Sequence, residues 1–341
     1  MLKCGNKPLQ RTEQNSKFYA EFLPMGLLGK AFGIFQFENT MQGSSDFLQH
    51  KWCSLHMAYG ILLHLPCLLI YMFAEKYPWF YSIIPVFVLR GLIIISACIY
   101  YEKFILEIIR KVEEFDINYW KFSGRLVTPN RRICFIWMAL AVMTALIKII
   151  GCMNFVDDKY YDGLLGSLIP VTGVIALLTR SICINTYILL CYSLSSRFCD
   201  LFKQWKYILK KCMVIHSVFP TKYLQAENIE DIRILHGHLV GIVKKLNDCY
   251  GARILIFFAM VFFEILGDMY IYICGREARN ETQVMFNCFN VIDIILMATV
   301  TTYMAKCVSM HIERMFPNCR FNISLKHYII LSYNISKYQE N

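Results

Sequence analysis

The sequence predicts an all-α fold, a multi-pass membrane helix bundle of six spans with long helical extensions on the cytoplasmic side. Of the 341 residues, 57% are hydrophobic and only 18% are charged, whereas ordinary soluble domains carry about 25% charged residues. Six stretches come close to the ~20 apolar residues that a membrane helix needs. Lys and Arg gather in alternate loops, as they do in the cytoplasmic loops of membrane proteins.

The candidate spans divide the chain into three parts. We expect a cytoplasmic N-terminal segment at 1–51, a helix bundle at 52–307 and a cytoplasmic C-terminal tail at 308–341. The first apolar run is short and follows a polar, charged lead, so we expect no cleavable signal peptide. The six spans are predicted at residues 52–74, 79–101, 132–155, 165–192, 251–274 and 284–307.

Charge orients this bundle. The segment before residue 52 and the two long loops, 102–131 and 193–250, are rich in Lys and Arg, whereas the short loops EKYP, VDDKYYDG and GREARNETQ are not. The positive-inside bias therefore places the N-terminus and the long loops in the cytoplasm. It also assigns the net charge of +10 to these loops and to anionic lipid rather than to nucleic acid. The outer loop carries a glycosylation sequon at Asn280, on the luminal side where it can be used.

A charged helix is predicted to run directly into the fifth span, with at most a brief break at Gly251. In the stretch LHGHLVGIVKKLNDCYGARILIFFAM, residues 235–260, Lys244, Lys245 and Asp248 lie off one apolar face. That face has helical spacing and consists of Leu235, Leu239, Ile242, Val243 and Leu246. Such a stripe has to be buried against the neighbouring stretch 193–215, a partner subunit or the membrane surface. We therefore expect a helix bundle below the membrane.

No enzyme, cofactor or metal site is expected. The sequence has no HExxH or GxSxG motif, and GLLGKAFG lacks the spacing of a phosphate loop. His236 and His238 stand two apart on a helix and point in different directions, so they are poorly placed to share a metal. The fifteen Cys include no CxxC pair, and most are expected to be small packing residues inside apolar runs.

Charged residues inside the predicted spans are informative because a charge at mid-bilayer costs at least about 2.5–3.5 kcal/mol. Depth along the helices, at 1.5 Å per residue, pairs Arg90 with Glu264 or Asp293, and Lys148 with Asp268. Two interpretations remain open. The pairs either hold the bundle together or line a wet cavity.

Aromatic residues gather near the outer ends of the spans. They form either an interfacial belt or a pocket for a small organic molecule that opens outward. If a pocket exists, residues of similar depth are the candidate ligand-binding side chains: Phe80, Tyr81, Lys148, Asp268, Phe286 and Asn290.

Three stretches carry a resemblance to a known family. LPMGLLGKAFGIFQF, residues 23–37, is similar to an N-terminal run of aliphatics followed by Lys/Arg-x-Phe-Gly, with Gln36 in place of a usual Pro. LHGHLVGIVKKLNDCYGARILI, residues 235–256, looks like the segment leading into a fifth helix. NVIDIILMATVTTYMAKCVSMHIERM, residues 290–315, resembles a sixth helix and its exit. Together with the inward N-terminus, these stretches resemble the gustatory receptors of the insect chemoreceptor superfamily.

The resemblance implies a subunit of a ligand-gated cation channel in the plasma membrane. Such a subunit detects small-molecule tastants in taste perception and signal transduction, and assembles as a homo- or hetero-tetramer. The family has a seventh helix that lines the ion pathway, begins with Thr-Tyr and ends with Gln-Phe. Here Thr302-Tyr303 stands in the sixth span and no such helix follows Met315. We therefore also expect the alternative of a truncated, non-conducting receptor, with out-of-family sequence after about Met310.

Two other classes of protein share part of this pattern. A small-molecule transporter is motivated by the charges inside the spans, but it would carry an internal repeat, which the sequence lacks. A G-protein-coupled receptor would need an extracellular N-terminus, and the charge bias is against it.

Overall fold

The computed structural model describes residues 17–35, 58–65, 102–125, 164–215, 222–274 and 298–310, together with a few isolated positions between them. All regular secondary structure in this part of the chain is α-helix. The predicted all-α class is therefore confirmed.

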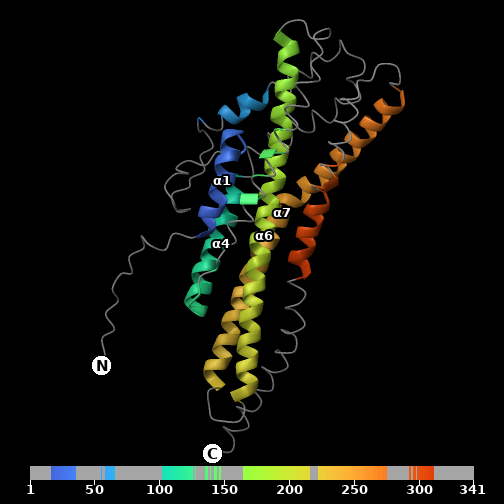
Figure 1. Cartoon of the computed structure of the whole chain (residues 1–341). Helices are drawn as coiled ribbons and strands as arrows, with labels where there is room; N and C mark the ends of the chain where they lie inside the picture. Colours follow the sequence, from blue (N-terminus) through green and yellow to red (C-terminus); the bar gives the residue numbers. More distant parts are fainter. Residues whose placement is uncertain are drawn as a thin grey trace, which may run out of the picture.

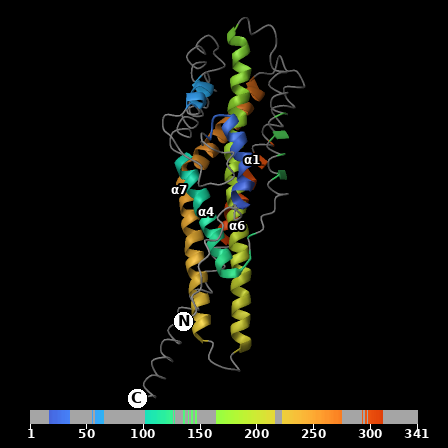
Figure 2. The same cartoon turned by 90° about the vertical axis from the view of Figure 1, so that its left-hand side faces the viewer.

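Four labelled helices carry the architecture. α6 (Leu164–Ile215) and α7 (Lys222–Cys274) have 52 and 53 residues, so each is about 80 Å long at 1.5 Å per residue. The shorter helix α1 (Lys17–Ala31) lies against the middle of α6 (Figure 1). The helix α4 (Glu102–Ser123) packs mainly against α7 and reaches α6 through side-chain contacts. The view turned by 90° shows the same arrangement, with α4 alongside α7 (Figure 2).

Side-chain contacts fix the directions of α4 and α6. Asp116 and Tyr119 of α4 contact Arg197 and Asp200 of α6 in the same order along the two chains. The two helices therefore run parallel. α4 ends where Gly124 takes a positive φ of 65°, which favours glycine, and donates its N–H to the carbonyl of Trp120 at 2.8 Å.

α7 runs antiparallel to both α4 and α6. Tyr187 and Phe198 of α6 contact Tyr250 and His236 of α7, in the reverse order along the chain. α6 and α7 thus form a long antiparallel helical hairpin. In Figure 1 its upper arms diverge.

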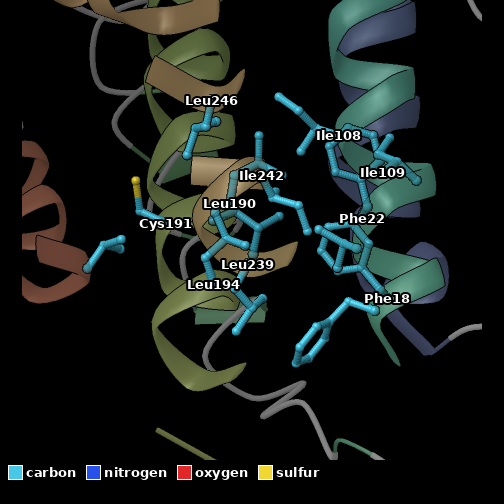
Figure 3. Close-up of a cluster of buried hydrophobic side chains, with 14 of the residues drawn as sticks. Phe18, Phe22, Ile108, Ile109, Leu190, Cys191, Leu194, Leu239, Ile242 and Leu246 are labelled. Atoms are coloured by element: carbon cyan, nitrogen blue, oxygen red, sulfur yellow. The ribbon is translucent and has the colours of Figure 1, made fainter. Parts of the chain in front are cut away.

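The core lies where the four helices meet. Its side chains come from all of them and point toward one another between α6 and α7 on one side and α1 and α4 on the other (Figure 3). The members labelled in Figure 3 are Phe18, Phe22, Ile108, Ile109, Leu190, Cys191, Leu194, Leu239, Ile242 and Leu246. A helix 298–310 adds Met304 and Val308 to the same cluster.

The apolar stripe predicted around Ile242 is buried as expected. Leu235, Leu239, Ile242 and Leu246 are all buried, and Val243 is partly buried. Of the three expected partners for the stripe, the structure shows packing within the chain, against α6 and also against α4. The stripe therefore anchors α7 in the bundle.

The predicted direct passage from the charged half of α7 into its apolar half is also confirmed. α7 is helical without interruption from Lys222 to Cys274, so Gly251 causes no break. A Cβ at Gly251 would lie 3.3 Å from Oδ1 of Asn247 on the preceding turn. The two halves of α7 thus form one continuous helix.

None of the described helices contains a stretch that is both long and apolar enough to cross a membrane. The predicted span 79–101 lies outside the described residues, as do most positions of 52–74 and 132–155. The six spans and the three-part division of the chain remain predictions.

The packing of α7 makes a testable prediction. Ile242 is 0% exposed and Ile234, on the same helix, is 56% exposed. We expect Ile242→Ala to lower the free energy of unfolding by about 2–5 kcal/mol, because it leaves a cavity in the core. The matched variant Ile234→Ala should change it by about 0.5 kcal/mol or less. Denaturant unfolding of the purified protein measures both values, and equal losses would contradict the observed burial.

Candidate functional site

Most of the residues predicted to bind a ligand, pair in the membrane or carry a glycan lie outside the described residues. These are Phe80, Tyr81, Arg90, Lys148, Asn280, Phe286, Asn290 and Asp293. Glu264 and Asp268 lie on α7, in the half that follows Gly251. The predicted pocket and charge pairs therefore remain predictions.

The described helices instead bring together a buried ion pair. The guanidinium of Arg197 on α6 donates two parallel hydrogen bonds to the carboxylate of Asp116 on α4, from Nε to Oδ1 at 2.8 Å and from Nη2 to Oδ2 at 2.6 Å. The Arg197 side chain is only 1% exposed and that of Asp116 is 15% exposed. This two-point geometry matches a planar guanidinium to a carboxylate and is among the strongest polar contacts in proteins.

Two further contacts complete the surroundings of Arg197. Its Nη1 donates to the carbonyl and to the hydroxyl of Ser193, one turn earlier on α6. The ring of Phe18 on α1 lies 4.9 Å from the guanidinium carbon, within the range of a cation–π interaction. We call these four residues, Phe18, Asp116, Ser193 and Arg197, the Arg197 site. It joins α1, α4 and α6 at one charged group.

A second row of polar contacts joins α4 to α7. Lys245 pairs with Glu107, and Nε2 of His238 lies 3.7 Å from a carboxylate oxygen of Glu114. The side chains of Glu107 and Glu114 are 43% and 64% exposed, so water and salt weaken these pairs. The row aligns α7 with α4 but stabilises the fold less than the Arg197 site does.

The two neighbouring histidines of α7 face different helices. His236 packs edge-on against Phe198 of α6, with ring centroids 5.8 Å apart, and burial lowers its pKa. His238 faces Glu114 and Phe115 of α4. The prediction that they point apart is confirmed. Within the described ranges, no three His, Cys, Asp or Glu side chains are grouped so that they could hold a metal ion.

Described cysteines behave as the small packing residues that were expected. Cys191 and Cys249 belong to the buried core, and neither forms a disulfide. Burial raises the pKa of Cys249 to about 12, although the charge of Arg253 opposes the effect. The thiol of Cys249 is therefore neutral and a poor nucleophile.

Residues 58–65 contact the C-terminal end of α1 and the turn that follows it. The hydroxyl of Tyr59 donates to the carbonyl of Ala31 at 2.8 Å, and Nε2 of His64 lies 3.0 Å from the carbonyl of Phe32. Gly33 has a φ of 68°, and a Cβ there would lie 2.7 Å from Cα of Gly60. This close approach requires glycine and ties the N-terminal segment to the helix that follows it.

No protein-family model matches the chain, and no curated protein matches it significantly. The family suggested by the residues therefore stays a proposal.

The Arg197 site was not predicted, because Arg197 stands among the basic residues of the predicted cytoplasmic loop 193–250. The partner helix, α4, lies within the loop 102–131. Its buried face had a visible signal in the helical spacing of its apolar residues: Ile105, Ile108, Ile109, Val112, Phe115 and Tyr119. No local pattern could show that Asp116 meets a residue 81 positions away.

The Arg197 site makes a prediction about stability. Arg197→Met leaves Asp116 without its cation, and we expect it to lower the free energy of unfolding by about 3–5 kcal/mol. Adding Asp116→Leu should restore much of the loss, because the second change removes the stranded charge. A double-mutant cycle by denaturant unfolding measures the coupling. Additive losses in the cycle would show that the two side chains do not interact.

His236 makes a prediction about pH. Burial holds its pKa below the ordinary 6.5, so the unfolded chain binds a proton that the folded chain excludes. The stability that depends on the neutral ring is complete above pH 6.5 and is lost as the pH falls toward the folded pKa. We expect Tm to fall less steeply below pH 6.5 in His236→Phe, which keeps an aromatic ring against Phe198. The same slope in both proteins would assign the acid sensitivity to other groups.

Proposed function

We propose that the chain is a gustatory-type chemoreceptor subunit, a multi-pass protein of the plasma membrane that responds to a small-molecule tastant. In this proposal the four-helix bundle of α1, α4, α6 and α7 lies on the cytoplasmic side. The apolar half of α7 and the part of α6 that precedes its core residues lie in the bilayer, and the tastant binds in their outer parts.

The observation that carries the membrane part of the proposal is a change in burial along the chain. Around the Arg197 site, large apolar side chains are buried between helices. Within the predicted spans, many described ones are exposed instead, as side chains that face lipid would be, whereas those at the inner ends of two spans, Ile182 to Cys191 and Met304, belong to the core. On α7 these are Leu255, Phe262, Phe263 and Leu266; elsewhere they include Leu62, Phe135, Met143, Ile292 and Leu296. Among the described residues outside the spans, the exposed large apolar ones are Phe104, Ile117, Tyr207 and Ile234.

The continuity of α7 supports the same orientation. One uninterrupted helix carries exposed Lys244 and Asp248 in its first half and exposed Phe262 and Phe263 in its second. A change of exposed surface within one helix suits a passage from water into lipid. In this proposal the Arg197 site lies just below the bilayer.

The receptor part of the proposal rests on the resemblance of residues 23–37, 235–256 and 290–315 to gustatory receptors. By that resemblance the subunit assembles as a homo- or hetero-tetramer and opens a cation pathway. Ligand binding would fall to Phe80, Tyr81, Lys148, Asp268, Phe286 and Asn290 at the outer ends of the spans.

The described bundle gives this receptor a route for its signal. α4 directly follows the predicted span 79–101, α6 continues the span 165–192, and α7 leads into the span 251–274. All three are packed together around the Arg197 site and the core above it. A tastant that moves one span relative to another therefore shifts the packed bundle below it. We expect that movement to change the contacts of the Arg197 site.

Topology provides the first test. In cells that express the chain with an epitope tag at Met1, we expect antibody to bind only after permeabilisation, because the N-terminus is cytoplasmic. The protein should also lose one N-glycan, seen as a gel shift, in the variant Asn280→Gln. The matched variant Asn334→Gln removes a sequon on the cytoplasmic side and should shift nothing. Antibody binding to intact cells would overturn the orientation.

Conduction provides the second test. Tastant-evoked currents should appear in cells that express the subunit with its partners, and Tyr81→Ala should raise the tastant concentration needed without lowering surface abundance. A chain that reaches the surface, binds tastant and passes no current would instead be the non-conducting receptor. Uptake of a labelled small molecule without a ligand-gated current would favour a transporter.

A further inference from the structure

Ser123 closes the C-terminal end of α4. Its Oγ accepts the backbone N–H of Arg125 at 3.1 Å and donates to the carbonyl of Tyr119 at 2.8 Å, with the carbonyl of Arg125 as an alternative acceptor at 3.2 Å. One hydroxyl therefore supplies the hydrogen bonds that end the helix and turn the chain. Any change to this oxygen changes the last turn of α4.

The surroundings of Ser123 are open. The next residue, Gly124, is exposed, has a φ of 65° and has no atom within 4 Å of the place where a Cβ would stand. Arg125 and Lys121, two residues away on either side, are also exposed. By contrast, Thr186 and Ser193 are buried inside α6. Ser123 is thus a partly exposed hydroxyl at a helix end, next to a turn.

From this geometry we propose that Ser123 is a phosphorylation site for a basophilic serine kinase. Kinases choose substrates by complementary charge, and Lys-Phe-Ser-Gly-Arg, residues 121–125, presents a positive charge on each side of the hydroxyl. In the reaction, Oγ of Ser123 forms a bond to the γ-phosphorus of ATP while the bond to the β–γ bridging oxygen breaks. ADP leaves, and the hydroxyl proton passes to the kinase's aspartate base.

A phosphate at this position disrupts the end of α4. The modified oxygen has no proton to donate to Tyr119, and the added charge of about −1.5 to −2 stands at the negative end of the helix dipole. The last turn also holds the Tyr119 ring, which stacks on Phe115 at 5.8 Å and directs its hydroxyl to the carbonyl of Asp200 on α6. Phosphorylation therefore loosens α4 from α6 two turns below the Arg197 site.

Two cations, Arg125 and Lys203, are placed to bind the phosphate on Ser123. The backbone N–H of Arg125 donates to Oγ of Ser123, and Lys203 pairs at 2.9 Å with Asp200, whose carbonyl accepts the Tyr119 hydroxyl. A phosphate draws Lys203 away from that exposed pair, because the phosphate carries more charge and more acceptor oxygens. The modification thus replaces the contact between Tyr119 of α4 and Asp200 of α6 with contacts between the phosphate and nearby cations.

The test uses the purified full-length chain in detergent, a basophilic serine kinase and ATP, with the phosphate located by mass spectrometry. We expect phosphate on Ser123, none on Ser123→Ala, and retained phosphorylation of Ser123→Thr. Lys121→Gln with Arg125→Gln should slow the reaction by about tenfold or more. Ser196 is partly exposed but lies inside α6, so it is the internal control and should stay unmodified. No phosphate on Ser123, or equal phosphate on Ser196, would overturn the proposal.

Hydrogen exchange tests the structural consequence on the same samples. The amides of Gly124 and Arg125, which are bonded to Trp120 and Ser123, should exchange about tenfold faster after phosphorylation. Unchanged exchange would show that the phosphate does not open the helix end. In cells the proposal rests on the cytoplasmic side assigned under the proposed function. The purified chain needs no such assignment, so failure here would leave the receptor function standing.

Discussion

A guanidinium that is buried away from water needs hydrogen-bond acceptors and a counter-charge within the protein. For Arg197, this requirement brings three helices together around one side chain. Asp116 sets the distance between α4 and α6, and the ring of Phe18 brings α1 against the same group. The apolar core above it packs only if these helices keep their spacing. A buried pair of this kind adds less to stability than its geometry suggests, but it penalises every arrangement that separates its members.

α7 extends beyond the part of the bundle that surrounds the Arg197 site. Its first half is held by apolar contacts with α4 and α6 and by the exposed pairs of Lys245 and His238. In its second half, large apolar side chains such as Phe262 face outward. Since no break separates the halves, a displacement of the apolar half is transmitted along a continuous helix to the packed half. In the proposed receptor, this coupling links a binding event in the outer bilayer to the cytoplasmic bundle.

Local patterns in the sequence accounted for part of this structure. The spacing of Leu235, Leu239 and Ile242 predicted both the helix and its buried face, because helical period and burial are properties of neighbouring residues. The Arg197 site could not be found in this way. A basic residue has the same local pattern in a solvated loop and in a buried pair, and only the meeting of α4 with α6 distinguishes the two. The predicted ligand residues, from Phe80 to Asn290, depend on distant contacts in the same way, and no local pattern tests them.

The account depends most on the claim that α7 passes from water into lipid near Gly251. Spin labels at exposed positions along α7, from Ile234 and Lys244 to Leu255, Phe262 and Phe263, measure this in the reconstituted protein. Collisions with oxygen, which concentrates in lipid, are compared with collisions with a water-soluble nickel complex. The account predicts that nickel dominates at Ile234 and Lys244 and that oxygen dominates at Phe262 and Phe263. Access of nickel to all five positions would contradict it.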